Sequence, residues 1–440
     1  MRTTYILLFV LFTFLRYPLY GQEETLSKGE AVKLTLENNF GITIAKNNLK
    51  VAENNKGLLN SGFLPSLTAN GGASYDNNDQ EATFQDGNSR TVDGAETTRY
   101  NASLDLNYTL FDGLGRWYDY KRLKEEYNLS ELQARETIET TMLQLFTVYF
   151  EVARVSENIA VLEETFANTR NRLTRAEYSF EYGQTNKLDV LNAQVDKVND
   201  SINLMNEIQT LKNTQRDLNV LLNRELSTDF KVDTTVVFTD PITLEEFLID
   251  GEANNIRMLQ AEKNIMINDY SLKSGKSVFL PTIGLTGSYG WNEGNFPATN
   301  FLASNTSTGF SAGVNLSWNL FDGGNGITQI KNAKILLDSQ ETLEQQIKQE
   351  IRRDIANAKG NYSNRLKVYE LQEQNVVTAT NNYERSNERY KLGQVSSVEL
   401  RQAQINLLNA KTSRSLAKYN AKLAELQLLQ LTGQLLNVDL

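Results

Sequence analysis

The sequence predicts a mainly α-helical chain with transmembrane β-strands, in which long antiparallel helical hairpins and pairs of strands occur twice. Three observations predict this fold class. Residues 101–110 alternate apolar and polar side chains, as a strand with one buried face does. Residues 113–182 then contain no proline, which indicates a helix of roughly 65 to 70 residues, on the order of 100 Å long. The same strand-to-helix transition recurs at residues 310–323.

The composition excludes several classes of chemistry. The 440 residues include no cysteine and no histidine, and the formal charge is −10. Disulfides, the usual zinc sites and histidine acid–base catalysis are therefore excluded, and the acidic balance argues against a nucleic-acid partner. The chain contains neither a G-x-S-x-G motif nor a phosphate-binding G-x-x-x-x-G-K-[ST] motif. We expect no enzyme, no cofactor and no metal, so any energy for the protein's work must come from a partner.

Residues 1–21 are typical of a signal peptide. Arg2 supplies a charged start, and the apolar run 5–15 is shorter than a membrane span. Cleavage after Gly21 would leave a chain beginning at Gln22. The alternative interpretation of this segment is a membrane anchor.

The first repeat is expected over residues 22–241. A helix is predicted from Leu26 to Gly62, with Ser27 and Glu30 as a possible capping box. The strand pair 66–76/100–110 follows, separated by a long polar loop, and a long helical hairpin occupies 113–225. Apolar residues in the first helix of this hairpin have heptad-like spacing: Ile138, Met142, Leu145, Tyr149 and Val152. A short strand is predicted at 235–238.

The second repeat, residues 242–440, contains the same elements. A helix over 242–275 precedes the strand pair 282–291/310–320, and a second helical hairpin is expected at 323–433. Corresponding prolines are 281 − 65 = 216 residues apart, but corresponding aspartates are 322 − 112 = 210 apart. The first polar loop is therefore longer, whereas the two long helices should have equal length. Loop length varies while helix length is kept, as expected if the helices must reach a fixed distance.

Each strand pair ends in the same Leu-Phe-Asp-Gly junction to a long helix. Aspartate is a good helix N-cap, so Asp112 and Asp322 are expected to begin the two long helices. The junction residues are Phe111, Asp112, Gly113, Phe321, Asp322 and Gly323.

Four amphipathic strands of about ten residues suit a bilayer when tilted. They cannot close alone, because small barrels need about eight strands and an open edge is not tolerated in lipid. Three copies give 3 × 4 = 12 strands, whereas two give eight, a barrel that side chains would fill. Aromatic residues on the apolar face indicate an interfacial girdle: Tyr75, Tyr100, Tyr108, Tyr289, Trp291 and Trp318. The alternative is a soluble β-sandwich, which needs more strands than four.

The order of these motifs resembles the TolC family of outer-membrane efflux proteins. The resemblance rests on the duplicated chain, the Phe-Leu-Pro entry to each strand pair, the Leu-Phe-Asp-Gly junctions and the Y-x-x-G turn before residues 188–194. It covers nearly the whole chain after residue 21. It implies a homotrimer with a 12-stranded barrel in outer-membrane lipid and a periplasmic helical tunnel. It also implies a periplasmic adaptor, an inner-membrane transporter and passive passage of the cargo in efflux or type I secretion.

The two turns within the helical hairpins are the strongest site candidates. Glycine gives a tight reversal its backbone freedom, and a hydroxyl or amide side chain can cap the returning helix. The resemblance makes these turns the adaptor-docking tips, while the alternative is turn chemistry alone; both can hold together. The residues are Gly183, Gln184 and Thr185 in the first turn and Gly393, Gln394, Val395 and Ser396 in the second.

Family members narrow at the tip through acidic residues in a pattern resembling V-D-V-L-D-A. The corresponding stretch here is 398–403, where Glu399 keeps one acid, Gln402 replaces the other and Arg401 intervenes. A ring of three carboxylates would attract cations, so Asp189, Glu399 and Gln402 are the candidates for a tip constriction. The alternative is helix capping, because Ser396 and Glu399 form a capping-box pattern.

A second class of function is a trimeric, barrel-anchored adhesive or structural coiled-coil protein. Trimeric adhesins carry their four strands as one block at the C-terminus. In this chain the strands come as two separated hairpins between helices, which favours a duct. The cargo and the energy source of the pump have no signal in the sequence.

Overall fold

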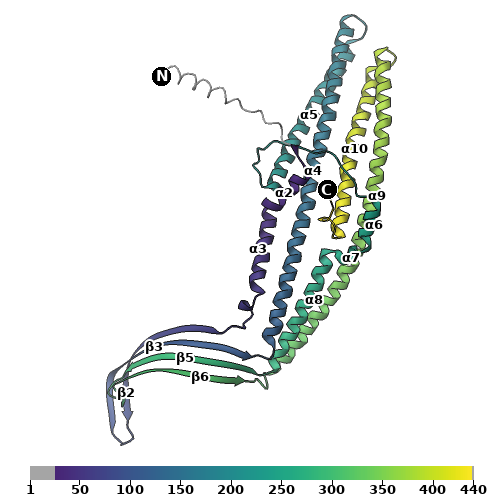
Figure 1. Ribbon diagram of the computed structural model, residues 1–440. Helices are drawn as coiled ribbons and strands as arrows, with labels where there is room; N and C mark the ends of the chain where they lie inside the picture. The colour runs from purple at the N-terminus through teal and green to yellow at the C-terminus, as the bar shows by residue number, and fades with distance from the viewer. Residues whose placement is uncertain (1–24, 439–440) are drawn as a thin grey trace, which may run out of the picture. The chain divides into compact units, whose positions relative to one another are not determined.

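The computed structural model describes residues 25–438 and divides into two compact units (Figure 1). The first unit comprises residues 25–46, 134–258 and 348–438; the second comprises 47–133 and 259–347. Each unit therefore takes residues from both halves of the sequence. The expected signal peptide, residues 1–21, lies outside the described residues.

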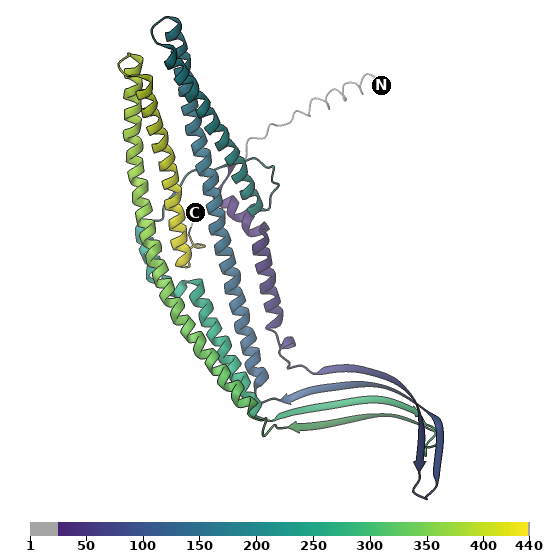
Figure 2. The same ribbon diagram turned by 180° about the vertical axis from the view of Figure 1, so that it is seen from behind.

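The first unit contains the greater part of two antiparallel helical hairpins; residues 115–133 and 325–347, the first parts of their long helices, belong to the second unit. In the first hairpin, α4 (Gly115–Glu181) is followed by α5 (Lys187–Leu222). In the second, α9 (Asn325–Lys391) is followed by α10 (Ser397–Leu431). Both long helices have 67 residues, which confirms the prediction of equal length. Figures 1 and 2 show the turns of the two hairpins at the same end of this unit.

The core of the first unit forms where the heptad-like stripe of α4 is buried. Met142, Leu145, Tyr149 and Val152 are each at most 2% exposed, which confirms the predicted packing face. The stripe packs with residues of α5 and α10, namely Leu218, Leu222, Tyr419, Leu426, Leu428 and Leu429. Full burial of each large apolar side chain contributes about 1.5–3 kcal/mol, so this cluster outweighs any single helix cap.

Tyr149 fixes a small two-stranded sheet to this core. Its hydroxyl donates to the Leu26 carbonyl at 2.8 Å and accepts from the Asp233 backbone N–H at 3.0 Å. These residues adjoin β1 (Thr25–Leu26) and β4 (Lys231–Val232), which pair in parallel. Burial is the main cause that raises the pKa of Tyr149 to about 12, so the hydroxyl keeps its proton at neutral pH.

The predicted strand at 235–238 is wrong, because residues 233–240 form no strand. Their backbone carbonyls are instead bound by side chains of α10. Tyr419 donates to the Thr234 carbonyl at 3.2 Å, and Lys422 donates to the Val237 carbonyl at 2.7 Å. The apolar residues of this segment, Val236 and Phe238, pack against the core.

The helix predicted over residues 26–62 is interrupted at Asn39. It divides into α2 (Lys28–Asn38), α3 (Phe40–Asn55) and the short η1 (Leu58–Asn60). The Asn39 side-chain oxygen accepts from the Ile42 backbone N–H at 3.2 Å, and its amide donates to the Leu221 carbonyl at 3.0 Å. Asn39 therefore begins α3 and also binds the last turn of α5.

The second half of the chain repeats this interruption at Asn255. The segment predicted as one helix forms α6 (Pro241–Ile249), α7 (Gly251–Asn254), α8 (Ile256–Gly275) and η2 (Lys276–Phe279). The Asn255 side-chain oxygen accepts from the Arg257 backbone N–H at 2.9 Å, while its amide donates to the Leu431 carbonyl at 2.7 Å. Asn39 and Asn255 thus make equivalent contacts. No helix within residues 25–438 is both long and apolar enough to cross a membrane.

The second unit contains a four-stranded antiparallel sheet in the order β2-β3-β5-β6. The strands are β2 (Ser66–Thr83), β3 (Ser89–Phe111), β5 (Thr282–Asn295) and β6 (Ser304–Ser317). The two predicted hairpins are present, and β3 and β5 join them into one sheet. Within residues 25–438, β2 and β6 each have a strand partner on one side only.

The long polar loop predicted at 76–99 is wrong, because β2 and β3 remain paired from Asp76 opposite Thr97 to Thr83 opposite Ser89. Backbone ladder bonds do not require apolar side chains, and polar cross-strand pairs support them. Arg99 forms an ion pair with Asp76 at 3.4 Å. In the other hairpin, β6 ends at Ser317 instead of residue 320, and Trp318 donates to the Phe279 carbonyl at 3.1 Å.

The register of the sheet places apolar residues of all four strands on one face. Leu67 of β2 lies opposite Leu106, Leu104 of β3 lies opposite Tyr289, and Tyr289 of β5 lies opposite Phe310. The other face is polar: Asp105 accepts from Asn70 at 2.7 Å and from Ser288 at 2.6 Å. The predicted division into an apolar and a polar face is therefore continuous across the sheet. Leu67 is 69% and Phe310 73% exposed in the protomer.

Candidate functional site: the tips of the helical hairpins

The first tip reverses the chain between α4 and α5 within five residues. Gly183 has φ +71°, a left-handed conformation that favours glycine. Its N–H donates to the Phe180 carbonyl at 3.0 Å, and the Gln184 N–H donates to the Ser179 carbonyl at 2.7 Å. This pair of bonds is a Schellman motif, which satisfies carbonyls at a helix C-terminus.

The second tip, between α9 and α10, repeats this geometry. Gly393 has φ +73°. Its N–H donates to the Tyr390 carbonyl at 3.0 Å, and the Gln394 N–H donates to the Arg389 carbonyl at 2.9 Å. Gln184 and Gln394 are exposed, whereas Thr185 and Val395 are partly buried. The turn geometry expected from the two glycines is confirmed at both tips.

Each tip also exposes two large apolar side chains that are not among the predicted turn residues. Tyr182 is 77% and Leu188 61% exposed in the first tip; Leu392 is 72% and Val398 63% exposed in the second. Both pairs are related by the repeat shift of 210, since 392 − 182 and 398 − 188 give this number. The sequence therefore contained a signal for an apolar surface beside each glycine, because the two repeats place apolar residues at equivalent positions.

Both candidate acids of the constriction accept hydrogen bonds within their own turns, and Glu399 takes part in a helix cap. Ser396 and Glu399 form a complete capping box: the Glu399 N–H donates to the Ser396 hydroxyl oxygen at 3.2 Å, and the Ser396 N–H donates to the Glu399 carboxylate at 2.7 Å. Donation from the Ser396 backbone N–H is the main cause that lowers the pKa of Glu399. Asp189 accepts from the Thr185 hydroxyl, and Asn186 caps α5. The capping interpretation of Ser396 is therefore confirmed.

The remaining constriction candidate, Gln402, is exposed and donates to the Asn406 side chain at 2.9 Å. Its neighbour Arg401 has a different environment. The Arg401 guanidinium binds both carboxylate oxygens of Asp200 on α5, at 2.7 and 2.8 Å. Asp200 also accepts from the Thr169 hydroxyl of α4 at 2.7 Å. This largely buried ion pair thus connects both hairpins near their tips.

In the second unit, the aspartates predicted to begin the long helices lie three residues before them, because α4 begins at Gly115 and α9 at Asn325, but their side chains still bind N–H groups near the helix starts. Asp112 accepts from the Arg116 backbone N–H at 3.0 Å and forms an ion pair with the Arg116 guanidinium at 2.9 Å. Asp322 accepts from the backbone N–H groups of Gly324 at 2.9 Å and Gly326 at 2.6 Å. The carboxylates therefore bind the free N–H groups at the helix N-termini.

The junction glycines allow a sharp turn between strand and helix. Gly113 has φ +70° and Gly323 φ +72°. A Cβ at Gly113 would lie 2.9 Å from the Ser277 carbonyl oxygen, so this position requires glycine for space as well as for conformation. Phe111 ends β3 opposite Ile283, while Phe321 follows β6 and is 84% exposed. The aspartates and glycines of the junctions therefore form the turns.

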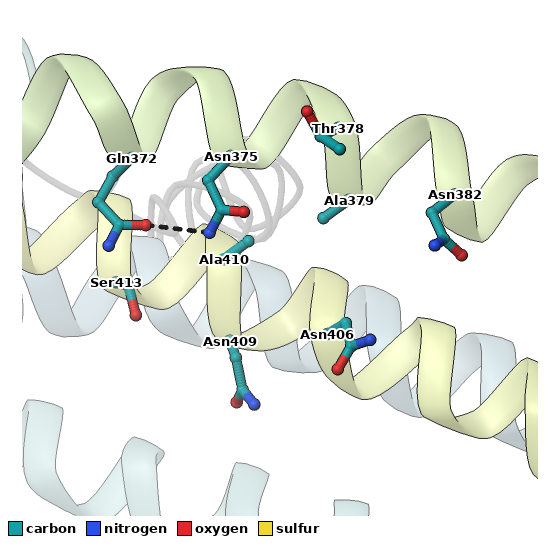
Figure 3. Close-up of a pocket in the computed structure, with 9 residues that line it drawn as sticks. All are labelled: Gln372, Asn375, Thr378, Ala379, Asn382, Asn406, Asn409, Ala410 and Ser413. Atoms are coloured by element: carbon teal, nitrogen blue, oxygen red, sulfur yellow. Dashed lines mark hydrogen bonds between the residues drawn. The ribbon is translucent and has the colours of Figure 1, made fainter.

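A shallow groove of about 360 Å³ runs between α9 and α10 behind the second tip. Figure 3 shows its carboxamide, hydroxyl and small side chains, with Asn375 donating to Gln372 at 3.2 Å. No charged residue lines it among the described residues. The groove therefore offers hydrogen bonds without attracting either sign of charge. Within residues 25–438, no three carboxylates, histidines or cysteines meet in a metal-binding arrangement.

Known proteins share both the sequence pattern and this fold. The TolC outer membrane protein of Vibrio cholerae is 24% identical over 389 residues, which cover 86% of this chain and 84% of that protein. The Escherichia coli TolC protein is 23% identical over 370 residues, covering 80% and 73%. The crystal structure of the Campylobacter jejuni CmeC outer membrane channel superposes with a TM-score of 0.77 at 17% identity, covering 93% of this chain and 86% of that one.

The family model for outer membrane efflux proteins matches residues 31–224 and 250–434. The two matched ranges include all four long helices of the hairpins and all four strands of the large sheet. The resemblance noted in the sequence is confirmed, and the chain belongs to the outer membrane efflux protein family, whose members are outer-membrane transport proteins and not enzymes.

Proposed function

We propose that three copies of this chain form a passive duct through the outer membrane and the periplasm. Three four-stranded sheets would close into a barrel of 3 × 4 = 12 strands, and the helical hairpins would continue it as a tunnel. An inner-membrane transporter would supply the energy, and a periplasmic adaptor would join it to the duct, in efflux or type I secretion.

The observation that carries this proposal is the open sheet with one apolar face. Its apolar side chains are exposed in the protomer, and its outer strands β2 and β6 each lack one strand neighbour among the described residues. Backbone groups at such edges must be paired in lipid. Pairing β6 of one copy with β2 of the next satisfies both edges and turns the apolar face to outer-membrane lipid. The polar face around Asp105 would then line the lumen.

The exposed side of α5 independently supports association of several copies. Apolar residues recur there at alternating intervals of three and four, the spacing of a coiled-coil seam. All are exposed in the protomer: Leu188, Leu191, Val195, Val198, Ile202 and Met205. A seam of this length is expected to be covered by a helix of another copy or of a partner.

Paired cysteine substitutions test the closure, because the chain contains no cysteine of its own. Asn70→Cys in β2 would be combined with Ser311→Cys, Gly313→Cys or Asn315→Cys in β6, all on the polar face. We expect one combination to give disulfide-linked dimers and trimers in isolated outer membranes. Asn70→Cys with Ala312→Cys, which lies on the apolar face, is the control. Monomers from every combination would contradict the proposed edge pairing.

The tips are proposed as the adaptor-docking surface, formed by Gly183, Gln184 and Thr185 in one hairpin and Gly393, Gln394, Val395 and Ser396 in the other. Their support is the repeated turn and the exposed apolar residues beside it. A photo-crosslinking amino acid at position 184 or 394 should capture the adaptor in cells. The same probe at exposed Lys367, far along α9 from its tip, should not. Equal capture from all three positions would contradict docking at the tips.

A tip constriction formed by Asp189, Glu399 and Gln402 from three copies is the second part of this proposal. Its carboxylates would favour cations over anions. Planar-bilayer conductance of the wild type and of Asp189→Asn/Glu399→Gln measures this preference. A cation preference that falls in the variant supports the constriction, whereas identical ion selectivity would contradict it.

A further inference from the structure

A second polar cavity lies between the two hairpins close to their tips. It has a volume of about 220 Å³, below the range of about 300–1,000 Å³ typical of drug-sized ligand sites. Residues of α4 and α9 form its walls, and Leu400 and Gln404 of α10 form part of its floor, where each is at most 5% exposed. All of these residues belong to the first unit. The cavity therefore suits a small ligand held within one protomer.

Arg172 is a buried cation at this cavity with unused hydrogen-bond donors. Its side chain is 4% exposed, and one guanidinium nitrogen donates to Asp196 of α5. Its Nε and Nη1 atoms are buried and have no hydrogen-bond partner among the described residues. Burial, and to a lesser extent the positive charge of Arg401, lower the pKa of Arg172, but a guanidinium stays protonated in proteins. The cavity thus contains a permanent charge whose donors need an acceptor.

Two further cations line the same cavity. Arg175 donates to the Lys391 carbonyl at 2.9 Å and lies over the Tyr390 ring, 5.8 Å from its centroid. Arg175 forms no ion pair within the described part of the chain, whereas Lys391 pairs with Glu388 at 2.7 Å. The contacts of Arg175 hold its guanidinium in place without neutralising it.

The lining has an excess of positive charge. It includes three cations, Arg172, Arg175 and Lys391, and no carboxylate. Asp196 and Glu388 each neutralise one cation from outside the lining, which leaves one positive charge. The other polar residues of the lining are neutral hydrogen-bonding groups, among them Asn168, Asn171, Asn387 and Tyr383.

We propose that this cavity is a binding site for a small oxyanion, either a phosphate-type or a carboxylate-type group. Guanidinium groups bind such oxygens through paired N–H donors, and Arg172 has two free donors for this purpose. The anion is either free in solution or a carboxylate presented by a docked protein. An anion bound between α4 and α9 would join the two hairpins of one protomer near their tips. The inference does not depend on trimer formation or on the adaptor.

Calorimetric titration of the full-length, detergent-solubilised protein with inorganic phosphate tests the site. The test variant is Arg175→Gln/Lys391→Gln, whose residues are both exposed. The control is Arg170→Gln/Arg385→Gln, which removes the same charge from the same helices outside the cavity lining. We expect at least tenfold weaker phosphate binding in the test variant and unchanged binding in the control. Far-UV circular dichroism would verify that all proteins remain folded.

Arg172→Lys provides a second variant, which keeps the charge but removes the guanidinium donors, and it should also weaken binding. Acetate competition distinguishes the two chemistries: displacement of phosphate by acetate shows that the site accepts a carboxylate-type group, and its failure restricts the site to a phosphate-type group. Absence of phosphate and acetate binding to the wild type would overturn the proposal. Equal phosphate binding by wild type, test variant and control would also overturn it, because the ion would then be adventitious.

Discussion

The ion pair between Asp200 and Arg401 gives a quantitative test of how the two hairpins are held together. The Asp200 side chain is 2% exposed and that of Arg401 is 15% exposed, with contacts of 2.7 and 2.8 Å. Removing one partner of a buried pair leaves an uncompensated charge, which costs about 3–5 kcal/mol. Replacing both partners by apolar residues of similar volume is often nearly neutral.

We therefore expect Arg401→Met to lower the free energy of unfolding by about 3–5 kcal/mol, because Asp200 retains only the Thr169 hydroxyl as a short contact. Asp200→Leu should lower the free energy of unfolding by about 3 kcal/mol, the lower end of that range, because Arg401 keeps a longer contact of 3.5 Å to Asp196. The loss of unfolding free energy in the double variant should be smaller than the sum of the two single losses by at least about 2 kcal/mol.

The assay is urea unfolding of the detergent-solubilised protein, followed by far-UV circular dichroism of the helices. Lys367 and Glu370 provide a control, because they form an ion pair of similar length, 2.8 Å, but are 66% and 50% exposed. Disrupting an exposed pair should change stability by about 0–1 kcal/mol. A coupling energy for Asp200 and Arg401 no larger than that of the control would refute the argument that burial makes this contact important.

Three further changes test the local structure by the same unfolding assay. Gly183→Ala should destabilise the first tip by about 1–2 kcal/mol because of its positive φ, although nothing lies within 4 Å of the added Cβ. The control Gly360→Ala, equally uncrowded but inside α9, should stabilise the protein by about 1 kcal/mol. Equal effects of the two changes would contradict the role of φ. Asn39→Ser keeps a cap acceptor but loses the donor to the Leu221 carbonyl, so a loss of about 1 kcal/mol is expected, and no loss would argue against that bond. Glu399→Gln should be less stable than the wild type above the ordinary glutamate pKa of about 4.3, because the folded-state pKa of Glu399 is lowered. This difference in stability should vanish as the pH falls through the folded-state pKa. A difference that stays constant with pH would contradict the lowered pKa.

The features that the sequence predicted best are those with a strong local period. The heptad-like stripe of α4, the absence of proline and the repeated turns were enough to predict two helices of equal length and the reversals at Gly183 and Gly393. The alternating faces of the strands were also readable, since a one-residue shift in register would reverse every side chain. Ser396 was identifiable as a cap because the capping box is a local pattern.

The features that sequence reasoning missed depend on contacts between distant residues. The roles of Asn39 and Asn255 were missed, because they require carbonyls at the ends of α5 and α10. The extension of β2 and β3 was missed because asparagine, aspartate and glycine usually indicate a loop. Arg401 was noted only as an interruption in an acidic pattern, since its partner Asp200 lies 201 residues earlier.

The most direct test of the proposed duct is the native mass of the protein extracted from outer membranes in mild detergent. One protomer carries four strands in the large sheet, and among the described residues the edge strands β2 and β6 are each paired on one side only. We predict a complex of three chains, which would give the 12-stranded closure. A stable monomer that keeps its strand content would contradict the account, because it would leave the edges of β2 and β6 unpaired in lipid.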